Sequence, residues 1–180
     1  KGVGVITGLA WTPMGGATLS VEAICIHKDT SGFKLTGQLG DVMKESAEIA
    51  YAYIVSQHEA FGIDKNFFEN AFIHLHVPAG ATPKDGPSAG ITMASALLSL
   101  GKGQPVDQIL AMTGELTLTG QVLPVGGIRE KVIAARRIKI YDLILPEANR
   151  RDFDDLPDYV REGVKVQFVK EYVEVTKLLW

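Results

Sequence analysis

The sequence has one cysteine, no long apolar run and no excess of positive charge, and these absences exclude several classes of protein. Charge, glycine or proline interrupts every apolar run well short of the roughly 20 residues that a membrane-spanning helix needs. Lysine plus arginine number 18 against 21 aspartate plus glutamate, a net charge of −3, so no basic field favours nucleic acid. We therefore expect neither a membrane span nor a nucleic-acid partner.

The single cysteine bears on the compartment. Cys25 has no partner for an intrachain disulfide, and it lies in an apolar stretch, residues 23–26, where a buried inert thiol is favoured over a nucleophile. Residues 1–4 lack the features of a signal peptide. We therefore expect a cytoplasmic protein, with the matrix of an organelle as the alternative.

The sequence does have ample apolar content for one packed core. Hydrophobic residues make up 46% of its 180 residues, and the length fits about one domain. No repeat, low-complexity tract or long linker divides the chain, so residues 1–180 are interpreted as a single compact domain. Early hairpins followed by alternating strands and helices predict an α+β (mixed α/β) fold.

Local patterns place the individual elements. A turn at residues 12–16 separates strands expected at 3–10 and 18–26, with a third strand at 33–36, and an antiparallel sheet is the simplest pairing. Apolar residues at helical spacing predict a long helix from residue 41 to about 61. Further strands are expected at 73–77, within 109–123, at 143–145 and at 164–168, and further helices at 88–101, 128–137 and 171–179.

A loop rich in glycine and proline, residues 79–87, leads into the helix expected to begin near Ser88. Gly80, Gly86 and Gly90 flank this serine. Backbone N–H groups and the positive end of the helix dipole stabilise negative charge at such a place, either a phosphate or the oxyanion formed when serine attacks a carbonyl. On the loop alone, an N-cap role for Ser88 is favoured, because serine is a preferred cap.

A nucleophilic serine needs a base, and Lys131 is a candidate in the helix expected at 128–137. The ordinary lysine pKa of about 10.4 must be lowered by desolvation or by a nearby positive charge before the amine can act as a base near neutral pH. Apolar neighbours make partial burial plausible. Taken alone, however, Lys131 is interpreted as a solvated helix lysine.

Two segments taken together change these interpretations. Residues 74–90 read HLHVPAGATPKDGPSAG, which resembles the active-site region of Lon proteases, and PKDGPSAG is the catalytic serine signature of that family. TGE at residues 113–115 and GQVLPVGGIREK at 120–131 resemble its lysine segment. The resemblance also includes GLAWT at 8–12 and TGQLGDVMKES at 36–46, so it covers nearly the whole chain.

The resemblance implies the C-terminal proteolytic domain of an ATP-dependent Lon protease of the LonA type. Such a domain is a serine endopeptidase with a Ser–Lys dyad, in which Ser88 is the nucleophile and Lys131 the general base. The implied substrates are unfolded, misfolded or regulatory proteins, cleaved through an acyl-enzyme in protein quality control and the stress response. The cleavage preference is not implied.

Supporting roles are implied for three further residues. Thr113 matches a threonine that orients the lysine amine, with a strand-end cap as the alternative. Asp85 and Gly86 belong to the serine loop, where Asp85 either modulates the loop or forms an ordinary Asp-Gly turn. Catalysis by Asp85 itself is not favoured, because a carboxylate near Lys131 would favour the protonated amine.

The family also implies partners that this chain does not contain. Its members form hexameric rings and carry an ATPase module, which needs a phosphate loop of the form G-x-x-x-x-G-K-[ST]. Residues 101–103, Gly-Lys-Gly, are the nearest fragment and lack both the spacing and the hydroxyl residue. We therefore expect no cofactor or metal in this domain, with ATP and Mg²⁺ and a homohexameric ring belonging to the longer parent protein.

His74 and His76 project to one face of their expected strand, because side chains alternate along a strand. A zinc site is one interpretation of the pair. No third ligand falls at metal-motif spacing, so a structural histidine face is favoured.

Two other functions remain as alternatives to the peptidase. One is a small-molecule kinase that holds nucleotide phosphates in the loop at residues 80–90, with Asp85 or Glu115 as a magnesium ligand. The other is a catalytically silent Lon-like module that only assembles or binds peptide. Both dyad residues are present, which favours the peptidase.

Overall fold

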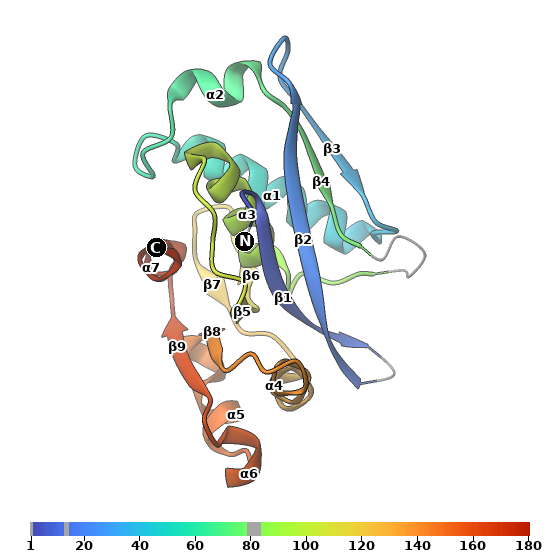
Figure 1. The fold of residues 1–180 in the computed structure, drawn as a ribbon, viewed down its shortest axis with the longest axis vertical. Coiled ribbons are helices and arrows are strands. Elements are labelled where there is room, and N and C mark those ends of the chain that lie inside the picture. Colours follow the sequence, from blue (N-terminus) through green and yellow to red (C-terminus); the bar gives the residue numbers. More distant parts are fainter. Residues whose placement is uncertain (1, 13–14, 79–83) are drawn as a thin grey trace.

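The computed structural model describes residues 2–12, 15–78 and 84–180, arranged around a twisted seven-stranded sheet (Figure 1). The strand order is β3-β4-β2-β1-β5-β8-β9, and β6 and β7 form a separate small sheet. Helices pack against this mixed sheet in one compact unit, which confirms the predicted fold class. The strands are β1 (Val5–Thr12), β2 (Gly15–His27), β3 (Gly32–Thr36), β4 (Phe72–His76), β5 (Leu110–Met112), β6 (Glu115–Leu116), β7 (Val122–Leu123), β8 (Asp142–Pro146) and β9 (Lys165–Val169).

The helices occupy the segments between the strands and the C-terminal end. They are α1 (Asp41–Ser56), α2 (Lys65–Asn70), α3 (Gly90–Lys102), α4 (Ile128–Arg137), the 3₁₀ turn η1 (Glu147–Asn149), α5 (Arg150–Asp154), α6 (Asp158–Arg161) and α7 (Tyr172–Leu179). The sequence predicted α1, α3, α4 and α7. It did not predict the short helices α2, α5 and α6, because four to six residues are too few to show a helical period.

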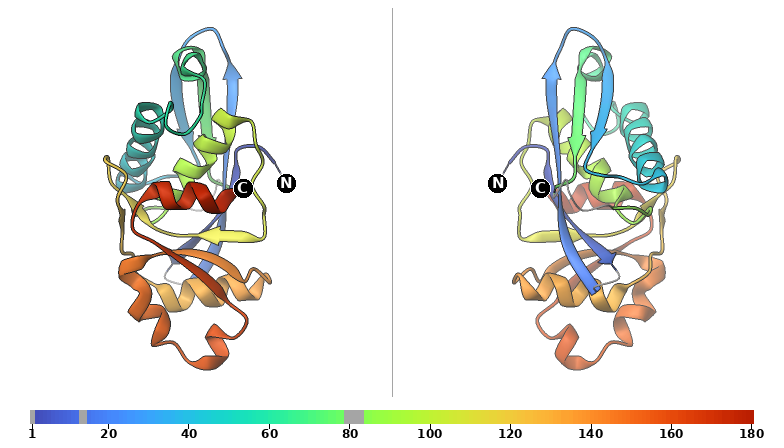
Figure 2. Two further views of the ribbon diagram at one scale, coloured as in Figure 1. Left: turned by 90° about the vertical axis from the view of Figure 1, so that its left-hand side faces the viewer. Right: turned by 90° about the vertical axis from the view of Figure 1, so that its right-hand side faces the viewer.

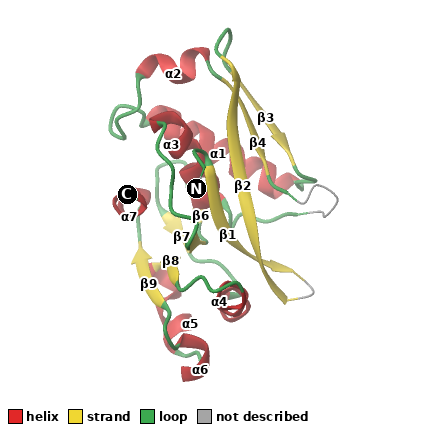
Figure 3. Cartoon of the chain, in the orientation of Figure 1, coloured by secondary structure: helices red, strands yellow, loops and turns green. Residues whose placement is uncertain are grey.

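The long β1–β2 hairpin forms the middle of the sheet. These strands pair antiparallel from Val5 opposite Glu22 to Thr12 opposite Gly15, as expected. The far half of β2 pairs antiparallel with β4. Figure 3 shows the long strand β2 running past both β4 and β1.

The antiparallel pairing expected for the third strand is wrong. β3 pairs with β4 in parallel, from Gly32 opposite Phe72 to Thr36 opposite His76. Both α1 and α2 lie between these strands in the chain. Parallel neighbours need a crossover of a dozen or more residues, and the two helices supply it.

The helix α1 ends at Ser56, earlier than the expected residue 61. The N–H of His58 bonds to the carbonyl of Val55, three residues back, at 3.3 Å, so the four-residue hydrogen-bond pattern of α1 stops there. The chain then turns, and Phe61 still returns to the core. The apolar spacing therefore identified the buried positions correctly but overestimated the length of the helix.

Two apolar clusters divide the interior. The larger lies between the sheet and helices α1 and α3, and residues 90–99 of α3 are all buried. The smaller packs α4 and the segment of α5 and α6 against β1, β5 and β8. Figure 2 shows α4, α5 and α6 together at the lower end of the molecule in both side views.

Candidate active site

Ser88 lies in the turn between residues 84–87 and the start of α3. The N–H of Gly90 donates a 3.2 Å hydrogen bond to the carbonyl of Pro87, which closes this turn. The N-cap of α3 is Ala89, whose side chain makes no capping hydrogen bond. The N-cap role favoured for Ser88 on the loop alone is therefore wrong. Within the described part of the chain, the half-buried Ser88 has no hydrogen bond from its hydroxyl.

The start of α3 leaves particular N–H groups available. The N–H groups of Gly90 and Ile91 are already bonded to carbonyl oxygens, at 3.2 and 3.1 Å. Those of Ser88 and Ala89 have no backbone acceptor among the residues that the structure describes. Donors for an anion therefore lie at the serine itself, just before the positive end of the helix.

Lys131 is buried on the first turn of α4, and only 1% of it is exposed. The backbone of α4 can approach the sheet closely at this point because Gly16 of β2 has no side chain: a Cβ there would overlap the carbonyl of Glu130. Burial lowers the pKa of Lys131 from 10.5 to about 8. The solvated-lysine interpretation is wrong, and the neutral fraction of the amine near neutral pH is much larger than that of an exposed lysine.

Thr113 connects Lys131 to the Ser88 segment. The Lys131 Nζ donates to the Thr113 Oγ1 at 3.0 Å, and the same hydroxyl donates to the Ser88 carbonyl at 3.2 Å. A neutral amine that donates here keeps its lone pair free to accept a proton from another direction. Backbone bonds from Gly114 to Ser88 (2.9 Å) and from Ile91 to Gly114 (3.1 Å) hold the two segments together.

The hydroxyl of Ser88 and the amine of Lys131 form no hydrogen bond with each other within the described residues. The structure nevertheless places both residues beside Thr113, which is fully buried. Catalytic hydrogen bonds are often long before substrate binds and shorten in the reacting complex. The arrangement is therefore compatible with proton transfer once a substrate orders the site.

The carboxylate of Asp85 is used away from Lys131, at the start of α1. It accepts the N–H of Met43 at 3.0 Å and the N–H of Gly86 at 2.8 Å. These backbone donors, Gly86 first, hold the pKa of Asp85 below its usual value. Asp85 thus caps α1, which leaves its carboxylate engaged and gives no support to a magnesium-ligand role in a kinase.

The segment before Ser88 is also attached to the turn after β3. The N–H of Gly40 bonds to the carbonyl of Lys84 at 2.7 Å, and the N–H of Lys84 bonds to the carbonyl of Gln38 at 2.9 Å. Residues 37–40 and 84–85 border a surface hollow of about 670 Å³. The expected loop glycine Gly80 lies outside the described residues, whereas Gly86 adopts the left-handed conformation with φ of +99°.

His74 and His76 lie together on one face of β4, as expected from strand alternation. The hydroxyl of Thr36 on β3 lies 2.7 Å from the Nε2 of His74 and 2.7 Å from the Nδ1 of His76. Among the described residues, no group of three or more His, Cys, Asp or Glu side chains is arranged to hold a metal ion. No sequence pattern points to Thr36, because its contact with the histidines depends on the parallel pairing of β3 with β4.

No helix in the described ranges is both long and apolar enough to cross a membrane.

A serine and a buried lysine brought together on a mixed sheet are the components of a peptidase site, and the comparison with known families agrees. The family described as the Lon protease (S16) C-terminal proteolytic domain matches residues 1–180, and the chain belongs to this family. Lon protease 2 of Hydrogenovibrio crunogenus is 64% identical over 98% of the chain. Lon protease of Magnetococcus marinus is 60% identical over 99%, and Lon protease homolog 1, mitochondrial, of Arabidopsis thaliana is 55% identical over 98%.

The chain spans about a fifth of the length of these curated relatives: 20%, 22% and 19%, respectively. The family match identifies a proteolytic domain.

Proposed function

We propose that this chain is the proteolytic domain of a longer ATP-dependent protease and that it cleaves peptide bonds with a Ser88–Lys131 dyad. The observation that carries the proposal is the burial of Lys131, whose pKa falls to about 8, together with its link through Thr113 to the backbone of Ser88. A buried, neutral amine beside a serine is what a Ser–Lys hydrolase requires.

The chemistry follows from this arrangement. Neutral Lys131 takes the hydroxyl proton while the Ser88 Oγ attacks the carbonyl carbon of the peptide. The oxyanion that forms accepts hydrogen bonds from N–H groups at Ser88 and Ala89. Protonated Lys131 then gives its proton to the leaving amine. Water, activated by the same lysine, hydrolyses the acyl-enzyme and releases Ser88.

Thr113 and Asp85 support the dyad in different ways. Thr113 orients the amine of Lys131 and leaves its lone pair directed elsewhere. Asp85 holds the serine segment against the start of α1. Its negative charge therefore lies beside that helix and not beside the Lys131 amine. A carboxylate at Lys131 would raise the pKa of the amine and reduce the neutral fraction.

The roles of the longer protein extend this proposal. Its ATPase module, with ATP and Mg²⁺, would unfold and deliver damaged or regulatory proteins, and a homohexameric ring would enclose the proteolytic sites. We propose the cytoplasm as the compartment of the longer protein, with an organellar matrix as the alternative, because one relative is named as mitochondrial. In this domain no residue is proposed to hold a cofactor.

Covalent labelling tests the dyad. The full-length protein, with ATP present, and the 180-residue chain are each incubated with a serine-reactive boronate or acylating inhibitor, followed by intact-mass measurement and peptide mapping. We expect one adduct, on Ser88, that is absent in Ser88→Ala and strongly reduced in Lys131→Gln. Ser56→Ala is the matched control, because Ser56 is exposed and only caps a helix carbonyl.

The outcomes separate the alternatives. Peptide cleavage that survives Ser88→Ala would sink the nucleophile assignment, and retained turnover in Lys131→Gln would point to another base. A folded full-length protein that forms no adduct with ATP present would favour the silent module. Nucleotide binding by the isolated chain in a titration calorimeter would favour the kinase.

A further inference from the structure

The loop that leads into α4 is held by a buried asparagine. Asn149, only 2% exposed, accepts the N–H of Val125 at its Oδ1 (2.9 Å) and donates from its Nδ2 to the Val125 carbonyl (2.8 Å). Its Nδ2 also donates to Asp152 at 2.8 Å. The side-chain amide therefore binds both backbone groups of one residue, and the contact with Asp152 fixes which end of the amide faces which group.

The loop also has apolar contacts, because Val125 packs against the smaller apolar cluster and the Trp11 side chain lies against Gly127. Asn149 supplies its side-chain polar contact. Gly126 and Gly127 follow Val125, and a Cβ at Gly126 would meet no atom within 4 Å. Gly127 is left-handed, with φ of +72°, and its carbonyl accepts the N–H of Lys131 at 2.9 Å. The loop leads directly into the first turn of α4, which carries Lys131, so the path of the loop contributes to the position of Lys131.

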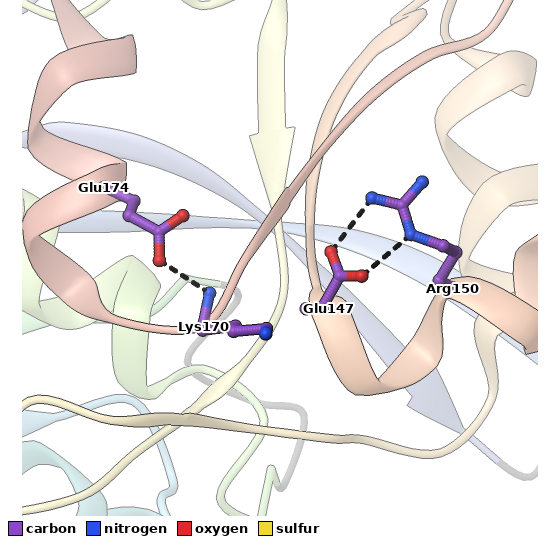
Figure 4. Close-up of polar contacts among 4 residues, drawn as sticks. All are labelled: Glu147, Arg150, Lys170 and Glu174. Carbon is purple, nitrogen blue, oxygen red and sulfur yellow. Dashed lines mark hydrogen bonds and ion pairs between the residues drawn. The ribbon is translucent and has the colours of Figure 1, made fainter.

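Asn149 lies in a short turn that an ion pair between neighbouring side chains holds in place. It is the last residue of η1, between Glu147 and Arg150, and these two side chains form a bidentate ion pair with both N–O distances at 2.9 Å (Figure 4). The guanidinium of Arg150 also lies 4.2 Å from the ring centroid of Phe168 on β9. The asparagine is thus attached to the sheet by groups independent of α4.

We propose that Asn149 is a positioning residue for the catalytic lysine: its side-chain amide clamps the backbone of Val125 and so sets where Lys131 enters the site. The proposal rests on the dyad function proposed above. Without the two hydrogen bonds from Asn149, the loop of Val125, Gly126 and Gly127 loses its side-chain polar contact. The first turn of α4 then moves relative to Thr113, and water reaches the amine of Lys131. Misplacement of a reacting group by about 1 Å can cost about 100-fold in rate.

The test is the pH profile of peptide cleavage by full-length wild-type protein and by Asn149→Ala. Wild-type activity is expected to rise with a midpoint near the Lys131 pKa of about 8. In Asn149→Ala we expect kcat to fall roughly 10- to 100-fold at pH 8 with little change in KM. We also expect the midpoint to move upward, toward the ordinary lysine pKa of about 10.4, because the amine becomes hydrated.

A matched core variant distinguishes positioning from general loss of stability. Val160→Ala removes a buried side chain from the same apolar cluster as α4, where Val160 is 2% exposed, without touching the clamp. We expect it to lower Tm and to leave the pH midpoint in place. An equal shift of the midpoint in Val160→Ala, or an unchanged midpoint and kcat in Asn149→Ala, overturns the proposal.

The exposed Asp152 gives a milder second route if Asn149→Ala does not fold. Asp152→Ala removes the acceptor that orients the amide, whereas Asp152→Asn keeps an acceptor oxygen, so the loss of kcat should be larger for alanine. Equal kcat values for the two variants and wild type would contradict the clamp. Cleavage by Ser88→Ala at the wild-type rate would instead contradict the dyad. Failure of the Asn149 proposal and failure of the dyad proposal are therefore distinguishable.

Discussion

The two proposed catalytic residues are held in opposite ways. Lys131 lies on a regular helix, is only 1% exposed, and has a lowered pKa because water is excluded. Ser88 lies in an irregular turn, half-buried, at the end of a segment that is held by backbone bonds to the turn after β3 and by the Asp85 carboxylate at the start of α1. The difference follows from their tasks: a lysine base needs desolvation, whereas a nucleophile must meet an incoming peptide.

The sharpest way to probe this contrast is to replace the buried amine by an apolar side chain of similar length. Lys131→Met should abolish cleavage and at the same time stabilise the fold. The folded pKa of about 8 lies below the ordinary 10.5, so below pH 8 the folded state carries a buried charge that costs roughly 3 kcal/mol. The gain should be largest below pH 8, decline as pH rises, and vanish above about 10.5.

Chemical denaturation of Lys131→Met and wild type at a series of pH values measures this effect. Ser88→Ala is the control, because it should abolish cleavage without a comparable pH-dependent change in the free energy of unfolding. A Lys131→Met variant that is less stable than wild type at neutral pH would contradict a desolvated amine.

Removing the link between the two residues should have the next largest effect. Thr113→Val keeps the shape of a fully buried side chain but removes the hydroxyl that accepts from Lys131 and donates to Ser88. We expect kcat to fall by about 10- to 100-fold, because the amine is no longer oriented. The stability loss should be about 1–3 kcal/mol, because the Ser88 carbonyl keeps its bond from Gly114 but the buried Lys131 amine loses its acceptor. Thr113→Ser should recover most of kcat, and equal kcat for valine and serine variants would exclude an orienting role.

The segment before Ser88 can be displaced without changing Ser88 or Lys131. A Cβ at Gly40 would overlap the carboxylate of Asp85, although the φ of −73° at Gly40 is ordinary for alanine. Gly40→Ala should therefore displace Asp85 and reduce kcat by a few-fold, less than the ~10-fold minimum for Thr113→Val. In an Asp85→Ala background, Gly40→Ala should have no further effect. Additive losses in the double variant would show that the two residues act separately.

The loss of folding stability at acidic pH should also depend on the hydrogen bonds of the Asp85 carboxylate. The folded pKa of Asp85 is lower than its ordinary 3.8, so its carboxylate stabilises the fold above that pH, and the contribution is lost as pH falls through the lower folded value. Asp85→Ala should therefore show a weaker loss of stability than wild type in that acidic range. The same slope in both proteins would place the acid sensitivity elsewhere.

The smallest expected effect concerns the strand before the serine segment. Burial, followed by Lys34 and His76, lowers the pKa of His74 below 6.5, so His74 contributes stability that is lost as pH falls below 6.5. Lys34→Gln removes one positive neighbour and should raise the pKa of His74 slightly, as measured by NMR titration of the ring protons. The exposed His27 is the internal control, and an unchanged His74 titration would show that Lys34 does not affect its pKa.

Periodicity predicted the fold well where elements are long and regular. The helix at residues 128–137 has the predicted bounds, and the β1–β2 hairpin pairs as expected. Patterns failed where the partner lies far along the chain. The sequence places residues 33–36 in a strand, but only the crossover through α1 and α2 shows that this strand lies parallel to β4. The short helices near residues 147–161 have no periodic signal.

The candidate site shows the same division. The motifs at residues 83–90 and 120–131 suggest Ser88 and Lys131 as a pair by resemblance, and local patterns alone favoured a helix cap and a solvated lysine. The structure removes both local interpretations, because Ala89 is the N-cap and Lys131 is buried. Asn149 gave no signal at all, since an asparagine after a strand is an ordinary turn residue.

The sequence by itself determined the mixed fold class, the long elements and the identity of the residues that can carry the chemistry. Only the tertiary structure decided what state those residues are in. The lysine pKa depends on water excluded by β2, α4 and Thr113 together, and the contacts of Asp85, Thr36 and Asn149 each join segments more than 20 residues apart. Desolvation and long-range hydrogen bonds are properties of packed neighbours, and a local pattern along the chain contains no information about them.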